Sequence, residues 1–242
     1  MTAQNQGAGA ASPPLLTTGR HDCPYLAERM ARTQFLDPRE PLTGAVYEVL
    51  IRRGFRRSGA YLYRPTCPLC NACRSLRIPA ADFHFRRRHR RCLRRNGELH
   101  VAAREPRLSD EQHELYRRYL QNRHAGSDMV EGIATVNEFL TADWCDTVFY
   151  EVRAEPAGDL LAVAVTDILP NALSAVYTFY DPRHADRGLG TLAVLWQLGE
   201  ARRLRRHHLY LGYWIAEAET MAYKEGFRPH EVFDGTEWVR VE

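Results

Sequence analysis

The sequence predicts an α+β protein with a mixed sheet in its second half and a smaller α+β domain before it. Three β-rich runs, residues 147–153, 160–168 and 174–179, are separated by turn signals and predict consecutive antiparallel strands. A glycine-containing loop and a long helix at residues 189–206 follow them. At 242 residues the chain is long enough to bury one large core or two modest ones.

The net charge of +3 conceals an asymmetry between the two halves of the chain. Residues 1–105 contain 19 arginines and 8 acidic residues, a net charge of +11. Residues 106–242 contain 14 basic and 22 acidic residues, a net charge of −8. The sequence therefore predicts a disordered tail at 1–20, a basic domain at 21–105 that suits a polyanionic partner, and a second domain at 106–242.

The composition is that of an ordinary soluble globular protein, with 45% apolar and 26% charged residues. No apolar run approaches the roughly 20 residues that a membrane helix needs. The N-terminal tail lacks the basic region of a signal peptide and is rich in small and polar residues. We expect a cytoplasmic protein with reduced thiols and no membrane partner.

The first half predicts short elements around a cysteine-rich loop. Apolar side chains recur near the 3.6-residue period from Leu42 to Arg53, and Gly54 ends that pattern. The predicted order is a strand-like segment at 21–38, a helix at 42–53, a hairpin edge at 55–64, a strand at 76–78, a basic helix at 83–95 and a strand at 99–103.

The second half begins with helices. A capping box from Ser109 to Gln112 predicts a helix that ends near residue 124, and Thr135 is expected to cap a shorter one. After the three strands, the predicted order is a loop at 181–188, the helix at 189–206, a strand at 208–212, a helix at 217–226 and closing strands at 230–239.

Three cysteines lie within seven residues, as Cys67, Cys70 and Cys73, and form a double C-x-x-C pattern. Thiolates at this spacing can converge on Zn²⁺ or an iron–sulfur cluster, with Cys23 as the fourth candidate ligand. The alternative is that all four are ordinary packed thiols.

Seven of the ten residues from Arg86 to Arg95 are arginine, and no acidic residue interrupts them. Residues 52–59 form a second basic patch. Aromatic residues accompany both, which is typical of contacts with phosphates and stacked bases. The alternative is a solvated helix face.

Gly188 and Gly190 immediately precede the long predicted helix. Free N–H groups and the positive end of a helix dipole at such a loop favour an anion. The order of strands, glycine loop, helix, strand and helix resembles the N-acetyltransferase (GNAT-like) fold, in which this loop holds a phosphate of the acyl carrier. The leading Arg or Gln of that pattern is replaced by Ala185.

Lys224 is the only lysine among 33 basic side chains. In a chain so biased toward arginine, the remaining lysine is expected where a compact charge or an amine with a shifted pKa is needed. The alternative is a chance survivor on a solvated helix.

Several long motifs resemble the aminoacyl-tRNA–protein transferases, with the bacterial aspartate/glutamate leucyltransferases as the nearest branch. The resemblance covers about residues 20 to 235. It rests on the segments 23–26, 54–59, 63–65, 70–73, 91–96, 180–182, 188–191, 210–215, 221–224 and 227–229. The eukaryotic branch binds metal or a cluster through paired cysteines, but here Leu26 replaces one of them. Gly188 stands where much of the family has serine.

The resemblance implies transfer of leucine from Leu-tRNA to proteins that begin with Asp or Glu, as a step in N-degron degradation. Aminolysis of the ester would need positioning, a proton acceptor and stabilisation of the oxyanion. We accordingly expect catalytic roles for Tyr180, for Asp181 as the group that orients or deprotonates the amine, and for Lys224 as a charge facing phosphate or ester oxygen. Arg56 and Arg57 are candidates for binding the acceptor's carboxylate. The alternative is that they contact the tRNA backbone.

The remaining predicted contacts are with the donor. The expected ligands of the tRNA 3′ end are Arg187, Gly188, Leu189, Gly190, Thr191, Tyr213 and Trp214. The expected contacts with the tRNA backbone are Arg86, Arg87, Arg90, Arg91, Arg94 and Arg95. No cofactor is needed for the chemistry, while a structural or regulatory Zn or Fe–S cluster is possible at Cys23, Cys67, Cys70 and Cys73.

Three alternatives stay open from the residues alone. An arginyl donor would fit the same motifs. An acetyl-CoA-dependent N-acetyltransferase would explain the second half, and a zinc-ribbon RNA-binding protein would explain the first.

Overall fold

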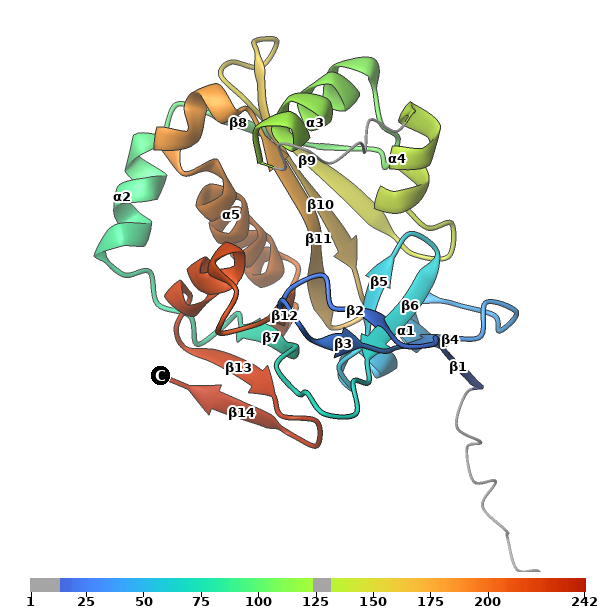
Figure 1. The fold of residues 1–242 in the computed structure, drawn as a ribbon. Coiled ribbons are helices and arrows are strands. Elements are labelled where there is room, and N and C mark those ends of the chain that lie inside the picture. Colours follow the sequence, from blue (N-terminus) through green and yellow to red (C-terminus); the bar gives the residue numbers. More distant parts are fainter. Residues whose placement is uncertain (1–13, 124–131) are drawn as a thin grey trace, which may run out of the picture.

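The computed structural model describes residues 14–123 and 132–242, and its centre is an eight-stranded mixed sheet (Figure 1). The strand order is β14-β13-β7-β12-β11-β10-β9-β8. In chain order the strands are β7 (Arg74–Pro79), β8 (His100–Arg104), β9 (Thr147–Arg153), β10 (Leu160–Ile168), β11 (Ala172–Tyr180), β12 (His208–Trp214), β13 (His230–Phe233) and β14 (Trp238–Val241).

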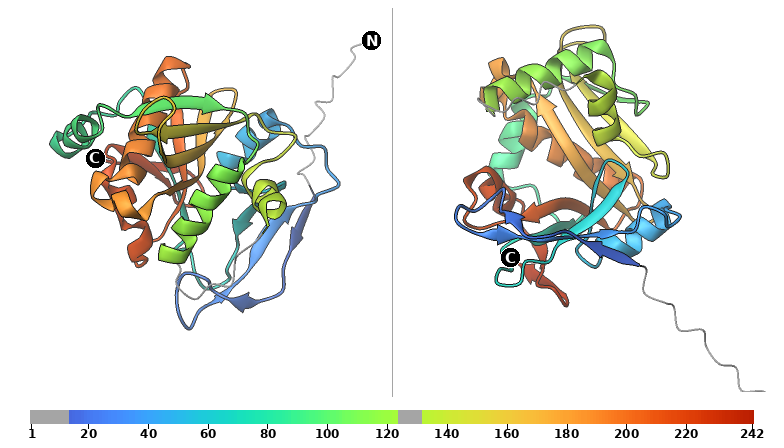
Figure 2. Two further views of the ribbon diagram at one scale, coloured as in Figure 1. Left: turned by 90° about the horizontal axis from the view of Figure 1, so that it is seen from above. Right: turned by 45° about the vertical axis from the view of Figure 1, so that its right-hand side comes forward.

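Two smaller sheets come from the first part of the chain. One has the order β1-β4-β6-β5, from β1 (Leu15–Thr17), β4 (Thr33–Leu36), β5 (Arg56–Ser58) and β6 (Tyr61–Pro65). The other pairs β2 (His21–Asp22) with β3 (Met30–Ala31). Two further views show that the four-stranded sheet and the arginine-rich helix lie apart, with the large sheet between them (Figure 2).

The helices cover both faces of the large sheet. They are α1 (Gly44–Ile51), α2 (Arg87–Arg95), α3 (Asp110–Arg123), α4 (Ile133–Leu140) and α5 (Leu189–Arg203), with 3₁₀ helices η1 (Pro182–Arg187) and η2 (Glu219–Gly226). Within the described ranges, no helix has the length and apolarity required to span a bilayer.

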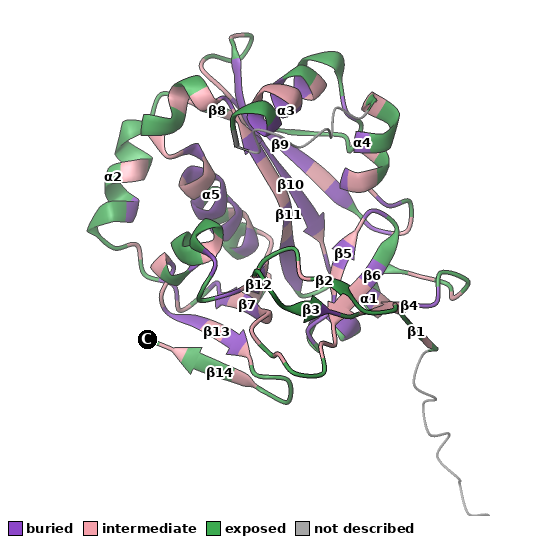
Figure 3. Ribbon diagram, in the orientation of Figure 1, coloured by how far each residue is buried: buried purple, intermediate pink, exposed green. Residues whose placement is uncertain are grey.

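Strand β10 shows why two layers of helix are needed. Val163 packs in the cluster formed with α3 and α4, whereas Ala162 packs in the cluster formed with α5. Because neighbouring side chains of a strand point to opposite faces, a strand that is apolar throughout must be covered on both sides. Figure 3 shows the result as buried central strands and a largely exposed α2.

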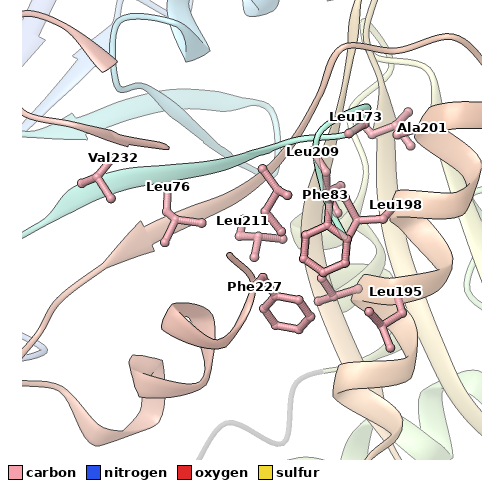
Figure 4. Close-up of a cluster of buried hydrophobic side chains, with 13 residues drawn as sticks. Leu76, Phe83, Leu173, Leu195, Leu198, Ala201, Leu209, Leu211, Phe227 and Val232 are labelled. Carbon is pink, nitrogen blue, oxygen red and sulfur yellow. The ribbon is translucent and has the colours of Figure 1, made fainter. Parts of the chain in front are cut away.

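The predicted domain boundary at residue 105 divides the chain into halves of opposite net charge, but the two halves pack together. Strand β7, from the basic half, lies between β12 and β13 and is antiparallel to both. Its side chains Leu76 and Ile78 share one core cluster with Leu195 and Leu198 of α5, part of which is drawn in Figure 4. The two predicted domains therefore build one sheet, and the part predicted to be GNAT-like incorporates strands from the basic half.

The predicted tail at 1–20 is wrong over residues 15–17, which form β1. Leu15 pairs with Leu36 of β4, so β1 satisfies hydrogen-bonding groups that the edge of β4 would otherwise expose. Residues 1–13 lie outside the described residues. Helix α4 also starts earlier than predicted, because Gly132 and not Thr135 is its N-cap.

Strands β11 and β12 are parallel neighbours that pair over only three residues. The pairs join Ala172–Ser174 to residues 208–210. The pairing of β12 with β7 also shifts register between Tyr210 and Gly212, where Gly212 has a φ of 72°. The carbonyls of β11 beyond Ser174 are consequently free to accept hydrogen bonds from a side chain placed between the strands.

Candidate active site and nucleic-acid interface

Helix α2 is docked on the glycine loop at the start of α5. Asn96, at its C-terminal end, donates from Nδ2 to the carbonyl of Arg187 at 3.0 Å. Arg95 donates to the carbonyl of Asp186, and Cys92 Sγ lies 3.7 Å from the carbonyl of Gly188. The arginine run and the glycine loop, each predicted separately to bind phosphate, are therefore adjacent in space.

A pocket lies between α2, the glycine loop and η2. Its lining is Arg88, His89, Arg91, Cys92, Arg95, Arg187, Gly188, Thr191, Tyr223, Gly226 and Phe227. Four of these side chains are guanidinium groups and none is a carboxylate. Gly188 is the N-cap of α5 and has no side chain that could bind the free N–H groups of the first turn. The positive end of the helix dipole therefore adds to the positive electrostatic potential of the pocket. The pocket has the chemistry of a phosphate site.

The six arginines predicted to follow a polynucleotide backbone are all exposed: Arg86, Arg87, Arg90, Arg91, Arg94 and Arg95. In the part of the chain that is described, no arginine of α2 forms an ion pair with a carboxylate. Arg91 and Arg95 line the phosphate pocket, and Arg88, which the sequence did not single out, lies there too.

Arg56 occupies the gap between β11 and β12. Its Nη2 donates to the carbonyl of Val176 at 2.9 Å. Its guanidinium lies 3.2 Å from the position that a Cβ on Gly212 would occupy. The hydroxyl groups of three tyrosines, Tyr25, Tyr63 and Tyr213, lie close enough to interact electrostatically with its guanidinium. Among the described residues, Arg56 has no carboxylate within ion-pair distance.

Arg57 was predicted to share the acceptor site, and the structure contradicts this. Its side chain is 1% exposed and forms a bidentate ion pair with Asp167 at 2.7 and 2.8 Å. The remaining donors reach the carbonyls of Gly59 and Leu140. Adjacent residues of a strand point to opposite faces, so Arg56 and Arg57 cannot reach the same ligand.

Asp181 was predicted to act as the base, but its geometry gives it a structural role. It accepts from the main-chain N–H of Arg183 at 3.0 Å and so caps η1. The Arg183 guanidinium binds both carboxylate oxygens, and Arg118 lies 3.5 Å away. Hydrogen bonding from Arg183 lowers the pKa of Asp181 although burial raises it. A carboxylate stabilised in this way is a weak proton acceptor.

Tyr180 packs on the glycine loop. Its ring lies 3.5 Å from the position that a Cβ on Gly190 would occupy, which is an ordinary van der Waals distance. Leu189 is fully buried in the cluster beneath α5, which leaves only its main chain for a ligand. Thr191 lines the phosphate pocket directly.

Lys224 was predicted to face phosphate or ester oxygen, but it faces the protein's own main chain. Its buried Nζ donates to the carbonyl of Leu211 at 2.8 Å and to that of Tyr213 at 2.5 Å. Burial, and then the nearby charge of Arg56, lower the pKa of Lys224 to about 7. A compact amine can hold the two carbonyls that flank Gly212, which a flat guanidinium would not fit.

Tyr213 and Trp214 do not share a pocket. The hydroxyl of Tyr213 lies within hydrogen-bonding distance of the carbonyls of Gly54 and Tyr63, on the Arg56 side of β12. Trp214 packs toward the α5 cluster, with Arg74 4.7 Å above its ring. Their separation follows from the alternation of side chains along the strand.

The chain has known relatives along almost its whole length. The model for the C terminus of arginine-tRNA-protein transferase matches residues 111–234, and that for the N terminus matches residues 21–91. The chain belongs to the arginine-tRNA-protein transferase family. Within that family it is 60% identical to the aspartate/glutamate leucyltransferase of Halorhodospira halophila, over 93% of this chain and 95% of the relative.

Other members of the arginine-tRNA-protein transferase family are also similar. The aspartate/glutamate leucyltransferases of Alkalilimnicola ehrlichii and Pseudomonas aeruginosa are 52% and 49% identical over 94% and 93% of this chain, and 95% of each relative is covered. Among solved structures, FemX superposes with a TM-score of 0.51 at 10% identity, over 78% of this chain and 66% of FemX. The predicted GNAT-like α+β class is confirmed.

In this member of the arginine-tRNA-protein transferase family, four cysteines gather at one pocket. Cys23, Cys67, Cys70 and Cys73 line it together with Tyr213. Burial, followed by the three other thiols, raises the pKa of Cys73 to about 12. Arg29 donates to Cys70 Sγ at 3.3 Å. The described ranges contain no group of three His, Cys, Asp or Glu side chains already arranged around a metal position.

Some residues of the site escaped sequence reasoning. Tyr25 and Tyr63, beside Arg56, lie in motifs that carry the family resemblance, but no role was predicted for either side chain. His89 interrupts a run of arginines and is the one buried side chain of α2. The presence of His89 within a run of arginines could have indicated that this side of the helix packs against the rest of the protein.

Proposed function

We propose that this protein transfers leucine from Leu-tRNA to the N-terminal Asp or Glu of other proteins. The observation that carries the proposal is the presence of two separate cationic sites: the pocket between α2, the glycine loop and η2, where among the described residues Arg187 alone pairs with a carboxylate, and Arg56 in the gap between β11 and β12. The arginine-lined phosphate pocket lies on the α5 side, and Arg56 approaches from the opposite side. A reaction that joins a polyanionic donor to an acidic acceptor needs two such sites. The names of the relatives, which are 49% to 60% identical, support the same reaction.

The donor occupies the phosphate pocket in this proposal. Phosphates of the tRNA 3′ strand meet the free N–H groups after Gly188 together with Arg91, Arg95 and Arg187, while the rest of α2 follows the acceptor stem. Phosphate neutralisation makes binding depend steeply on salt. The terminal ester is thereby directed toward the gap between β11 and β12.

The acceptor's carboxylate pairs with Arg56. Among the residues that the structure describes, no carboxylate pairs with the half-buried Arg56 guanidinium, and a bound anion would relieve the cost of that arrangement. The same site rejects Asn and Gln N-termini, because their amides would leave the cation unpaired. Arg56 and Lys224 would also repel a cationic donor side chain, which favours a leucyl over an arginyl donor.

The reaction is aminolysis. The neutral α-amine attacks the ester carbonyl, a C–N bond forms, the ester C–O bond breaks, and the tRNA hydroxyl leaves with a proton that the amine gives up. A free α-amino group has a pKa of about 7.7–8.0, so part of it is neutral at pH 7. Positioning of the two substrates is therefore the main contribution required of the protein. Lys224 contributes indirectly, by fixing the main chain around Gly212.

The test compares Leu-tRNA with Arg-tRNA as donors to matched peptides that begin with Asp, Glu or Asn. We expect labelled leucine on the acidic peptides only. Arg56→Gln should remove the preference for Asp over Asn, while Arg240→Gln, on the distant strand β14, serves as the charge-matched control. Transfer of arginine but not leucine, or an unchanged preference in Arg56→Gln, would contradict the assignment.

We also propose that the four cysteines hold a structural or regulatory Zn²⁺ or Fe–S cluster. Four thiols at one pocket are a suitable donor set for either, although the side chains must move to bind. Metal analysis and absorption spectra of protein purified under reducing conditions test this. Loss of the bound metal in Cys73→Ser is expected; metal-free wild-type protein would contradict it.

The reaction also supports a cytoplasmic location, because charged tRNA and newly exposed N-termini are found there. A product with N-terminal leucine would enter N-degron degradation. Fractionation of the source cells checks the location.

A further inference from the structure

His89 is an anomaly in α2. It is 1% exposed, whereas the seven arginines of residues 86–95 are exposed. Its ring stacks on Phe227 with centroids 5.5 Å apart and planes 6° apart, and it lies 5.2 Å from the Phe83 ring. Figure 4 shows Phe83 and Phe227 next to each other at the edge of the core beneath α5. His89 therefore anchors an otherwise solvated helix.

The hydrogen bonds of His89 join two elements. Nδ1 accepts from the main-chain N–H of Arg86 at 3.2 Å, within the first turn of α2. In the neutral ring the proton is then on Nε2, and the ring is also hydrogen bonded to the main chain of Gly226, the last residue of η2. Arg88 Nε lies 3.1 Å from Nε2 and donates to it in the other neutral tautomer. Burial, and then Arg88, lower the pKa of His89, which favours the neutral ring.

Arg88 of α2 also contacts η2. Its Nη2 lies 2.9 Å from the position that a Cβ on Gly226 would occupy, so the guanidinium lies against the main chain of that residue. Two residues earlier, Lys224 of η2 binds the carbonyls of Leu211 and Tyr213. The main-chain N–H of Phe227 in turn donates to the carbonyl of Lys224 at 3.2 Å. A continuous series of contacts thus leads from α2 to the segment around Gly212.

The two ends of α2 have different attachments. The C-terminal end holds the glycine loop through Asn96 and the carbonyl of Arg187. The N-terminal end holds η2 through His89. One helix thus contacts the donor site at one end and the support of β12 at the other, so the ends can be tested separately.

We propose that His89 is a positioning residue for the transfer reaction: it couples the arginine helix that meets the donor tRNA to Lys224 and the main chain at Gly212. This inference rests on the proposed function. Its consequence is that His89 affects turnover, whereas Asn96 affects capture of the donor.

Two near-isosteric variants separate the two hydrogen bonds. The Gln side-chain nitrogen reaches the place of Nε2, so His89→Gln can keep the contact with Gly226. The Asn side-chain oxygen reaches the place of Nδ1, so His89→Asn can keep only the contact with Arg86. We expect His89→Asn to lower kcat about tenfold with an unchanged KM for Leu-tRNA, and His89→Gln to recover most of kcat. Asn96→Ala should instead raise the KM for Leu-tRNA.

A double-mutant cycle tests the route through Lys224. If both substitutions interrupt the same series of contacts, the second one has little left to disrupt. The fold-decrease in kcat of the double variant His89→Asn/Lys224→Met should then be much smaller than the product of the fold-decreases of the two single variants. Asn96→Ala combined with Lys224→Met should be close to multiplicative. Equal kcat for the two His89 variants, or multiplicative His89 and Lys224 effects, would overturn the proposal.

Hydrogen exchange on the full chain without tRNA gives a readout that needs no activity. We expect His89→Asn to speed exchange in peptides covering 211–214 and 219–226, and His89→Gln to do so much less. Unchanged exchange at 211–214 in His89→Asn would overturn the coupling even if its kcat falls. Inactive wild-type protein with these exchange changes would refute the proposed function and leave the coupling supported.

Discussion

The guanidinium of Arg56 lies against the main chain of Gly212, 3.2 Å from where a Cβ would stand. Gly212 also has a φ of 72°, a left-handed conformation that other residues adopt at a cost. We expect Gly212→Ala to destabilise the protein by about 1–3 kcal/mol, measured by urea denaturation, and to reduce transfer because Arg56 is displaced.

Gly199 provides the matched control for that experiment. It lies on α5, is exposed, and a Cβ there would meet nothing within 4 Å. Gly199→Ala should stabilise the protein by roughly 0.5–1 kcal/mol, since alanine favours a helix interior. If Gly212→Ala and Gly199→Ala change the free energy of unfolding in the same direction, the lack of space around Gly212 does not explain the effect of Gly212→Ala.

Lys224 predicts a pH dependence of stability. The folded protein lowers the pKa of this amine from 10.5 to about 7. Between these values the unfolded chain binds more protons than the folded protein, so the contribution of Lys224 to the free energy of unfolding rises with pH. Below about pH 7 both states are protonated and the desolvation penalty is present in full. Denaturation of wild type and Lys224→Met at pH 6 to 9 checks this: the difference between them should change in favour of wild type as pH rises.

The buried pair Arg57–Asp167 predicts a large effect on stability and a small one on catalysis. Arg57→Met leaves Asp167 buried and unpaired, which should cost about 3–5 kcal/mol. Arg57→Met combined with Asp167→Leu should recover much of this loss. Thermal and denaturant unfolding give the stability, and kcat/KM of the folded double variant gives the catalytic effect. If the folded double variant transfers leucine but no longer prefers acidic acceptors, Arg57 does belong to the acceptor site and the prediction is wrong.

The phosphate pocket predicts a signature in salt titrations. Arg91→Gln and Arg95→Gln should each weaken tRNA binding and reduce the slope of log Kd against log salt by about 1. Arg240→Gln is the control, because Arg240 already pairs with Glu242 and Asp82. Equal slopes for all these proteins would remove the pocket from the donor site.

Local patterns in the sequence determined most of the elements. The predicted strands at 147–153 and 160–168 have the bounds observed for β9 and β10, because short runs rich in apolar and β-branched residues between turn signals specify a buried strand. Helix α2 and the long helix α5 were likewise predicted from periodicity and composition. The arginine run and the glycine loop were identified as anion sites for the same reason: their chemistry is local.

Only the tertiary structure decided which of these residues meet. It placed β7 of the basic half beside β12, sent Arg56 to the gap and Arg57 to Asp167, and turned Lys224 onto main-chain carbonyls. Pairing between distant segments is set by core packing and strand register, and no local pattern encodes either. The sequence thus specified the types of side chain available for binding, and the fold determined which ones point at a ligand and which hold the frame.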